Sequence, residues 1–213
     1  MDPAKGLLPE AGPSVIRYAE AEIPTSHGPL RVVVYREARS PEVREHAVLV
    51  CGRPDPDDVL ARIHSECLTS EVFGSLKCDC REQFDAGLSR IVENGSGMML
   101  YLRQEGRGIG LGNKIRAYAL QEQGLDTVDA NHQLGFATDL RTYDIAADML
   151  HDLGVRGVSL MTNNPDKIEG LEQSGIIVNQ RLSIEVEANP HSASYLGAKR
   201  VRLGHMLELV RSR

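Results

Sequence analysis

The chain has 213 residues and a formal net charge of −6, so it is long enough for one large domain or two small ones with a real core. The negative charge and the absence of tryptophan argue against a general nucleic-acid-binding surface. No apolar run approaches the roughly 20 residues that a membrane span needs, and the first residues lack a signal-peptide core. We therefore expect a cytoplasmic protein whose four cysteines are thiols or metal ligands, not disulfides.

The first 65 residues are expected to be mainly β-sheet. A stretch rich in Pro, Gly and Ala, residues 1–14, is predicted to be a flexible tail, and residues 51–58 a loop. Alternating apolar residues predict four strands, at Val15–Ile23, Leu30–Tyr35, His46–Val50 and Val59–His64.

From Cys80 onward, helical spacing of apolar residues alternates with short apolar strands. The predicted helices run from Cys80 to Asn94, over Ile115–Gln123 and Asp144–Leu153, from Pro165 to Gly175 and from Ser192 to about Val210. The predicted strands are Gly97–Leu102, Val158–Met161 and Ile176–Val178. We expect an α/β (α+β mixed) fold, with a β-rich N-terminal part packed on an α/β body with a mixed sheet, as a single domain over residues 15–213.

Three cysteines lie close together in the sequence, with the spacing C-x10-C-x-C at Cys67, Cys78 and Cys80. Thiolates suit zinc, and three protein ligands with an open fourth position are typical of a catalytic zinc. His64 is an alternative fourth ligand, and Cys51 a poorer one, which would make the site structural. Three buried, metal-free thiols are the other interpretation, and the spacing alone leaves the choice open.

A glycine-rich stretch, residues 106–112, follows a predicted strand and precedes a predicted helix, as phosphate-binding loops do. It fits neither the dinucleotide-binding nor the Walker pattern, so a flexible loop is the alternative. Four cations lie beside the glycines, and arginine suits bidentate contact with phosphate. We expect a pocket for a phosphorylated small molecule formed with Arg103, Arg107, Lys114 and Arg116.

Two polar stretches precede predicted helices. Residues 129–144 are interpreted as a loop in which Thr142 caps the next helix and His132 is a hydrogen-bonded structural histidine. Residues 162–167 form a strand-to-helix turn, the place where α/β folds often bind ligands; a simple helix cap is the alternative.

Five motifs in one order resemble the GTP cyclohydrolase II family, from about residue 60 to the last predicted helix. They are Arg62-Ile-His-Ser-Glu-Cys67, Lys77-Cys-Asp-Cys80, Arg103-Gln-Glu-Gly-Arg107-Gly-Ile-Gly110, Asn131-His-Gln-Leu-Gly-Phe136 and Thr162-Asn-Asn-Pro165. The resemblance implies a zinc- and magnesium-dependent homodimer. The implied reaction converts GTP to 2,5-diamino-6-ribosylamino-4(3H)-pyrimidinone 5′-phosphate, formate and pyrophosphate, the first step of riboflavin biosynthesis.

The same resemblance assigns roles to individual residues. The implied zinc ligands are Cys67, Cys78 and Cys80. Asp139 matches the family's proton acceptor, Arg141 its nucleophile toward the α-phosphate, and Tyr118 a tyrosine near the opened ring. A protonated guanidinium is a poor nucleophile, so electrostatic stabilisation by Arg141 is the alternative. The implied GTP-binding residues are Arg62, Ile63, His64, Ser65, Glu66, Gln83, Glu105, Gly106, Arg107, Thr127, Thr162 and Lys167.

Three rival functions stay open at this point. His64-Ser-Glu66 fits the first half of a zinc deaminase signature, but the Cys-x-x-Cys half is missing. A non-catalytic zinc- or GTP-binding module would show no turnover. A paralogue in a specialised pathway would stop at the formylated intermediate.

Overall fold

The computed structural model describes residues 12–38 and 43–186, together with 189, 197, 202, 204, 206 and 207. The predicted helix from Ser192 falls almost entirely outside the described residues, as do residues 1–11 of the predicted tail. Ser14, at the end of that predicted tail, donates from its backbone nitrogen to Asp148 at 2.6 Å.

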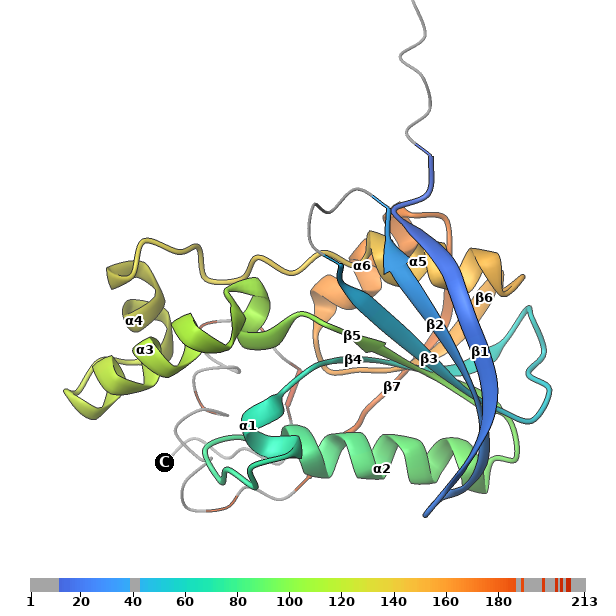
Figure 1. The fold of residues 1–213 in the computed structure, drawn as a ribbon, viewed down its shortest axis with the longest axis horizontal. Helices are drawn as coiled ribbons and strands as arrows, with labels where there is room; N and C mark the ends of the chain where they lie inside the picture. Colours follow the sequence, from blue (N-terminus) through green and yellow to red (C-terminus); the bar gives the residue numbers. More distant parts are fainter. Residues whose placement is uncertain are drawn as a thin grey trace, which may run out of the picture.

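The described chain is built on a seven-stranded sheet in the order β1-β2-β3-β5-β4-β6-β7 (Figure 1). The strands are β1 (Val15–Thr25), β2 (Gly28–Glu37), β3 (Glu45–Cys51), β4 (Val59–Ser65), β5 (Gly97–Leu102), β6 (Gly157–Met161) and β7 (Ile177–Leu182). The helical segments are α1 (Leu68–Glu71), α2 (Cys80–Glu93), η1 (Glu105–Gly108), α3 (Gly110–Glu122), α4 (Thr127–Gln133), α5 (Asp144–Asp152) and α6 (Pro165–Gln173).

The sheet is antiparallel on its N-terminal side and parallel on the other side. β1 and β2 form a hairpin closed at Thr25 and Gly28, and β3 pairs antiparallel with both β2 and β5. β5, β4, β6 and β7 are parallel neighbours, which requires the crossover helices between them. The mixed α/β fold class is confirmed, and the N-terminal strands continue the same sheet as the α/β body.

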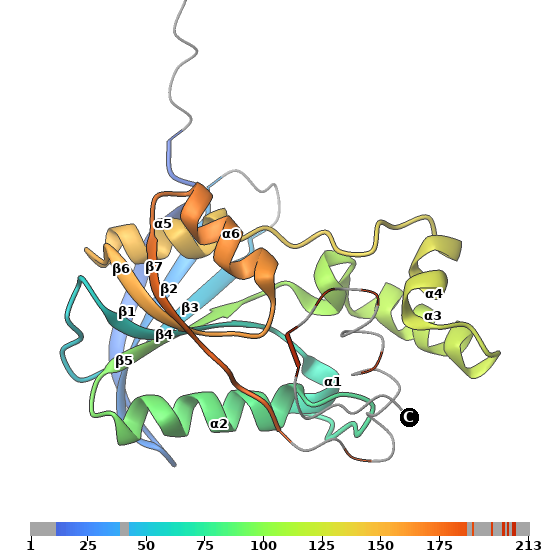
Figure 2. The same cartoon turned by 180° about the vertical axis from the view of Figure 1, so that it is seen from behind.

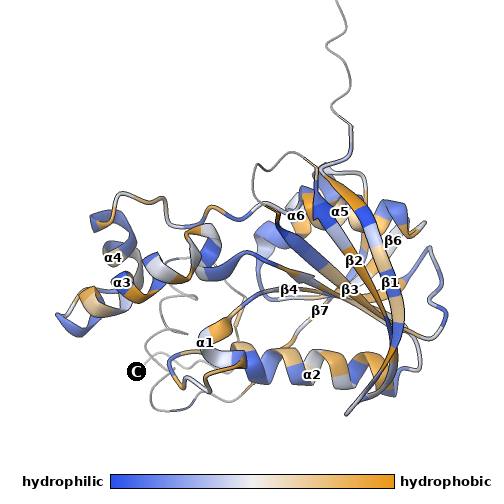
Figure 3. Ribbon diagram, in the orientation of Figure 1, coloured by the Kyte–Doolittle hydropathy of each residue, from blue (hydrophilic) through white to orange (hydrophobic). Residues whose placement is uncertain are grey.

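Helices cover both faces of the sheet, and each face has its own hydrophobic core. α2 packs on one face, where its Leu88 and Ile91 meet Met99 of β5; α5 and α6 cover the opposite face (Figures 1 and 2). Successive residues of β5 point to opposite cores, so Leu100 belongs to the α5 side. Figure 3 shows apolar residues on α2 and on the strands of the sheet.

Beyond the sheet, α3 and α4 pack against each other and extend to one side of the molecule (Figure 1). α4 lies where the sequence predicted a loop, and α3 begins at Gly110, inside the glycine-rich stretch. The predicted cap at Thr142 is wrong, because Tyr143 holds the N-cap position of α5 and makes no side-chain cap bond. Among the described helices, none has the length and apolar character to cross a bilayer.

Candidate active site

A cavity lies where β4 and β5 end. These parallel strands finish at Ser65 and Leu102, and their following loops approach each other, as expected at the carboxyl edge of a parallel sheet. The volume of the cavity, including its opening to solvent, is about 600 Å³. Ten residues predicted for the site line it: Ser65, Glu66, Cys67, Cys78, Cys80, Glu105, Gly106, Arg107, Tyr118 and Arg141.

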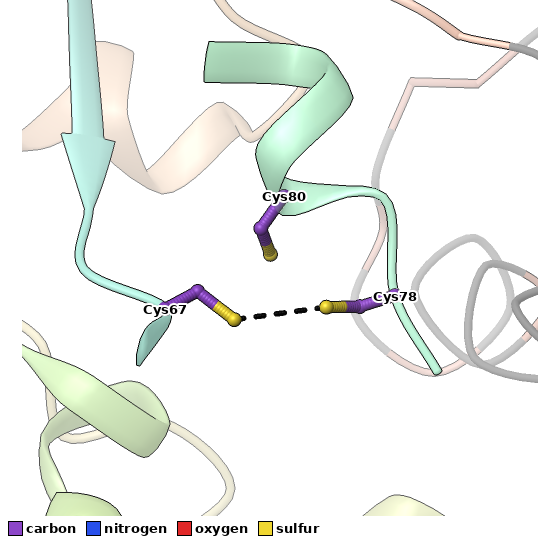
Figure 4. Close-up of side chains that lie close together, drawn as sticks. All are labelled: Cys67, Cys78 and Cys80. Carbon is purple, nitrogen blue, oxygen red and sulfur yellow. Dashed lines mark hydrogen bonds between the residues drawn. The ribbon is translucent and has the colours of Figure 1, made fainter. Parts of the chain in front are cut away.

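The three cysteines converge at one end of this cavity. Cys67 immediately precedes α1, and Cys80 is the first residue of α2, so the ends of two helices bring the thiols together. Their sulfur atoms all lie within 4.8 Å of one another, and those of Cys67 and Cys78 are 3.6 Å apart (Figure 4). Three soft donors at this spacing suit zinc.

The two alternative fourth ligands do not join this group among the described residues. The imidazole Nε2 of His64 lies 2.8 Å from Glu71 Oε1, and Cys51 packs with the apolar residues under α2. Among the described residues the group is therefore a set of three possible ligands.

Cys67 is the sulfur on which the surrounding contacts concentrate. Hydrogen bonds from Cys78 and Cys80 lower its pKa, burial opposes that shift, and the Lys114 charge and Thr69 add to it. The pKa of Cys78 is raised, chiefly because its proton is shared with Cys67. These contacts favour the thiolate form of Cys67, which is the form that binds a metal.

A buried polar network fixes the loop that carries Cys67. Glu71 Oε1 accepts from the Cys67 backbone nitrogen at 3.0 Å, and Glu71 Oε2 accepts from the Tyr101 hydroxyl at 2.6 Å. Burial lowers the pKa of His64 to about 4, with the Glu71 hydrogen bond acting in the opposite direction. His64 is thus neutral at pH 7 and serves as a structural partner of Glu71.

The glycine-rich stretch turns sharply at the cavity wall. Gly106 and Arg107 both have left-handed backbone conformations, with φ of 63° and 60°. A Cβ at Gly106 would lie 3.1 Å from both Ile109 and Lys114, so glycine is required on two grounds. Arg107 adopts this conformation despite its side chain, a strain that proteins retain mostly at functional sites.

The four predicted phosphate-binding cations separate in the structure. Arg103 pairs with Glu66 at 2.8 Å and is 54% exposed, while Arg116 bonds to Asn113 on the surface of α3. Of the four, Arg107 and Lys114 line the cavity. Lys114 points at Cys67, with Nζ 3.1 Å from Sγ.

Arg141 and Asp139 form a tight pair on the opposite wall. Arg141 Nε donates to both Asp139 oxygens, at 2.9 and 3.1 Å, and Nη2 donates to Oδ2 at 2.5 Å. Burial opposes the ionisation of Asp139, but the Arg141 contacts outweigh it and lower the pKa of Asp139. Asp139 is therefore a carboxylate that fixes the guanidinium; it lines a second hollow that shares Arg141 with the first.

The other predicted GTP-binding residues support the cavity from behind. Arg62 Nη2 donates to Gln83 at 2.7 Å, and Lys167 Nζ donates to the carbonyl of Ile63 at 2.7 Å. The Thr162 hydroxyl accepts from the backbone nitrogen of Asn164. None of these side chains lines the first cavity among the described residues. Thr127 lies in α4, and its side chain is outside the described residues.

Sequence reasoning missed several residues of the cavity. Gln104, Gln121 and Asn131 line it. Gln104 and Asn131 lie inside two of the quoted motifs but were given no role, and Gln121 lies about one helical turn after Tyr118 on α3. Ser65 Oγ and Gln104 Oε1 are buried beside it without a hydrogen-bond partner among the described residues. Buried oxygens of this kind usually find a partner, so these two are suited to contact a polar ligand.

Comparison with known proteins places the chain in a family. The family model described as GTP cyclohydrolase II matches residues 16–183. Over 192 residues, the chain is 51% identical to GTP cyclohydrolase-2 of Enterobacter sp. (strain 638), covering 90% of this chain and 97% of that protein. The GTP cyclohydrolase-2 of Klebsiella pneumoniae (strain 342) is 50% identical, with 90% and 95% covered.

Longer relatives match over only part of their length. The chain is 49% identical to riboflavin biosynthesis protein RibBA of Bacillus subtilis (strain 168) over 195 residues, 91% of this chain. It spans about half of that relative, 48% of its length. The solved structure of RibBX, a two-domain 3,4-dihydroxy-2-butanone 4-phosphate synthase from A. baumannii, matches with a TM-score of 0.47 at 20% identity, over 82% of this chain and 41% of that one.

Proposed function

This chain belongs to the GTP cyclohydrolase II family, and from that premise we propose that it hydrolyses GTP in the first step of riboflavin biosynthesis. The products are 2,5-diamino-6-ribosylamino-4(3H)-pyrimidinone 5′-phosphate, formate and pyrophosphate. The observation that carries the proposal is that one cavity is lined by the three cysteines, Tyr118 and Arg141. Hydrolysis of the guanine ring needs the cysteines, which would hold the metal, and cleavage of the phosphoanhydride needs Arg141.

The residues present fit a catalytic zinc. Cys67, Cys78 and Cys80 would hold it, because their sulfurs lie within 4.8 Å of one another and thiolates are among its preferred ligands. When bound, zinc supplies a Lewis acid and lowers the pKa of a water for attack on the guanine ring. The chain's own contribution is to keep Cys67 ionised and its loop fixed through Glu71.

The guanine and ribose would lie against the loops after β4 and β5. Ser65, Glu66, Gly106 and Arg107 line the cavity there, and the Ser65 hydroxyl has a vacant hydrogen-bonding capacity. Glu105 would act mainly by linking the segment after β4 to α3, since its carboxylate accepts hydrogen bonds from the Leu68 backbone nitrogen and from Lys114. The remaining predicted contacts would bind GTP through backbone groups or would shape this wall of the cavity. They are Arg62, Ile63, His64, Gln83, Thr127, Thr162 and Lys167.

Arg141 would stabilise charge on the α-phosphate while the α–β phosphoanhydride is cleaved. A guanidinium stays protonated at neutral pH, and Asp139 fixes its orientation through hydrogen bonds to Nε and Nη2. This geometry favours the electrostatic role over the nucleophilic one. Mg²⁺ would bind triphosphate oxygens, which are the hard ligands it prefers.

Tyr118 would donate a proton to, or orient, the opened ring. It lines the cavity with the cysteines, and its ring lies 4.8 Å from Lys77 Nζ and 5.8 Å from Lys114 Nζ. Tyr118→Phe should therefore slow formate release while leaving the metal in place.

The test is a product assay on zinc-loaded protein with GTP and Mg²⁺, following formate and pyrophosphate together. Release of both supports the proposal. Pyrophosphate with a formylated nucleotide and no formate would replace it with an enzyme that stops early. Bound zinc and GTP with no product would replace it with a binding module.

We expect the active protein to be a cytoplasmic homodimer, as the resemblance implies. Sedimentation of the full chain at micromolar concentration tests the assembly directly. A single species of monomer mass that retains full activity would contradict the dimer.

A further inference from the structure

The Lys114 ammonium is directed at the metal-ligand cluster and not at a phosphate position. Its Nζ lies 3.1 Å from Cys67 Sγ, 2.9 Å from Thr69 Oγ1 and 2.8 Å from Glu105 Oε1. An ammonium has three protons to donate, and these three acceptors match that number. The side chain is 12% exposed, so its direction is set by these partners and not by solvent.

Thr69 links the same cation to the same sulfur by a second route. Its Oγ1 accepts from Lys114 and lies 3.6 Å from Cys67 Sγ. With an oxygen lone pair occupied by the ammonium, the hydroxyl proton is available for the sulfur. Cys67 therefore has two outer donors, one charged and one polarised by that charge.

These two contacts differ from the others on Cys67. The thiols of Cys78 and Cys80 also contact its sulfur, but a metal held by all three replaces the thiol protons. An ammonium and a threonine hydroxyl are not among the usual protein ligands of zinc, so the contacts of Lys114 and Thr69 with Cys67 do not compete with metal binding. They form the outer shell that tunes a metal site.

We infer that Lys114 is a positioning residue that offsets the negative charge of the three-thiolate centre through Cys67. Three thiolates more than neutralise a dication, which weakens its Lewis acidity. An ammonium bonded to one thiolate withdraws electron density from that sulfur and restores part of the positive charge at the metal. This inference rests on the proposed metal-dependent function and names a residue that the predicted site assigned to phosphate.

The backbone explains why Lys114 occupies this position. Gly110 begins α3, and Lys114 lies one turn into that helix. The left-handed turn at Gly106 brings the Lys114 Cβ close beneath the loop, 3.1 Å from where a Gly106 Cβ would lie. Glu105 then bonds both to Lys114 and to the backbone nitrogen of Leu68, next to Cys67. The glycine turn therefore holds the cation against the cysteine loop.

The experiment replaces the metal with Co²⁺ in the full-length protein and records the thiolate-to-cobalt charge-transfer absorption with the affinity for the metal. In Lys114→Met, we expect the band to move to longer wavelength and the affinity to fall by about 10- to 100-fold, the range for outer-shell partners. Lys114→Arg should lie nearer the parent protein. Arg116→Met is the matched control, because Arg116 is a cation of the same helix that bonds to Asn113 at the exposed surface, 3.1 Å away, and it should change neither quantity.

A second variant guards against misfolding. Lys114→Met leaves the buried Glu105 carboxylate without its cation, so Lys114→Met/Glu105→Gln removes both charges together. The same band shift in the double variant, with an unshifted band in Glu105→Gln alone, supports the inference. An unshifted band in the double variant with cobalt bound would overturn it while leaving the metal site intact. Failure of the parent protein to bind cobalt through thiolates would overturn the metal site itself.

Discussion

The two walls of the cavity are held in different ways. The cysteine wall, which carries Cys67, Cys78 and Cys80, lies between the end of β4 and the start of α2. The carboxylate of Glu71 accepts a hydrogen bond from the backbone nitrogen of Cys67, and that of Glu105 accepts one from Leu68. The Arg141 wall is an irregular segment between α4 and α5, tied to the β5 side by Leu140 N to Arg107 O and by Gln104 to Thr142 O. The cysteine side of the cavity is therefore joined directly to the sheet, whereas the Arg141 side is an irregular segment held by the Asp139 ion pair and these two hydrogen bonds.

This difference implies that substitutions on the two walls should affect two different reactions: hydrolysis of the guanine ring and cleavage of the phosphoanhydride. Changes on the cysteine wall should act through the metal and through folding, because their contacts are buried. Changes on the Arg141 wall should alter phosphate chemistry with little loss of stability, because that segment lies between α4 and α5, outside the helices and strands.

Cys78→Ser should have the largest effect, removing the metal and lowering formate release by more than about 100-fold, since a ligand is lost and not merely an outer-shell partner. Metal content and formate are measured on the same sample. Cys51→Ser is the matched control, because Cys51 lies outside the three-cysteine group and should keep both. Normal metal content and full activity in Cys78→Ser would refute the ligand assignment.

Arg141→Ala should lower pyrophosphate release by about 10²- to 10³-fold, the usual cost of losing one transition-state donor. GTP binding, measured by calorimetry, should weaken far less. Arg141→Lys keeps the charge but not the paired bonds to Asp139, so it should recover little. Full rescue by saturating GTP would instead make Arg141 a binding residue.

Glu71→Gln should destabilise the fold by about 1–3 kcal/mol, because a buried acceptor for Tyr101, His64 and the Cys67 nitrogen is weakened. Chemical denaturation of the metal-free protein measures this without interference from ligand binding. Glu22→Gln, at an exposed position on β1, is the control and should be neutral. Equal stability of the two variants would show that the network is not structural.

The smallest effect should be a pH dependence of stability caused by His64. Its pKa is about 4 in the folded protein against about 6.5 for an exposed histidine, so the unfolded chain binds this proton first as pH falls. The folding stability that His64 contributes is fully present above pH 6.5 and is lost progressively as the pH falls toward 4. His64→Gln should flatten the stability curve in that window relative to the parent, although buried His46, whose pKa is also lowered by burial, still contributes. An unchanged slope would contradict the assignment.

The sequence was a good guide wherever the information is local. Apolar alternation located the four N-terminal strands within a few residues, because side chains of a strand point to opposite faces, and short apolar runs located the other three. It failed at α4, where polar residues 127–133 carry little apolar periodicity and the helix depends on packing against α3. Helix caps were equally unreliable, as Tyr143 in place of Thr142 illustrates.

By itself, the sequence determined the family and the candidate metal ligands, since Cys67, Cys78 and Cys80 lie within one short stretch that the ends of α1 and α2 bring together. Only the tertiary structure decided what each charge faces. It turned Arg103 outward, directed Lys114 at a sulfur and brought Arg141 to the cysteine cavity. Long cationic side chains have several rotamers of similar energy, so their direction is set by partners that are distant in the sequence and that only the folded chain assembles.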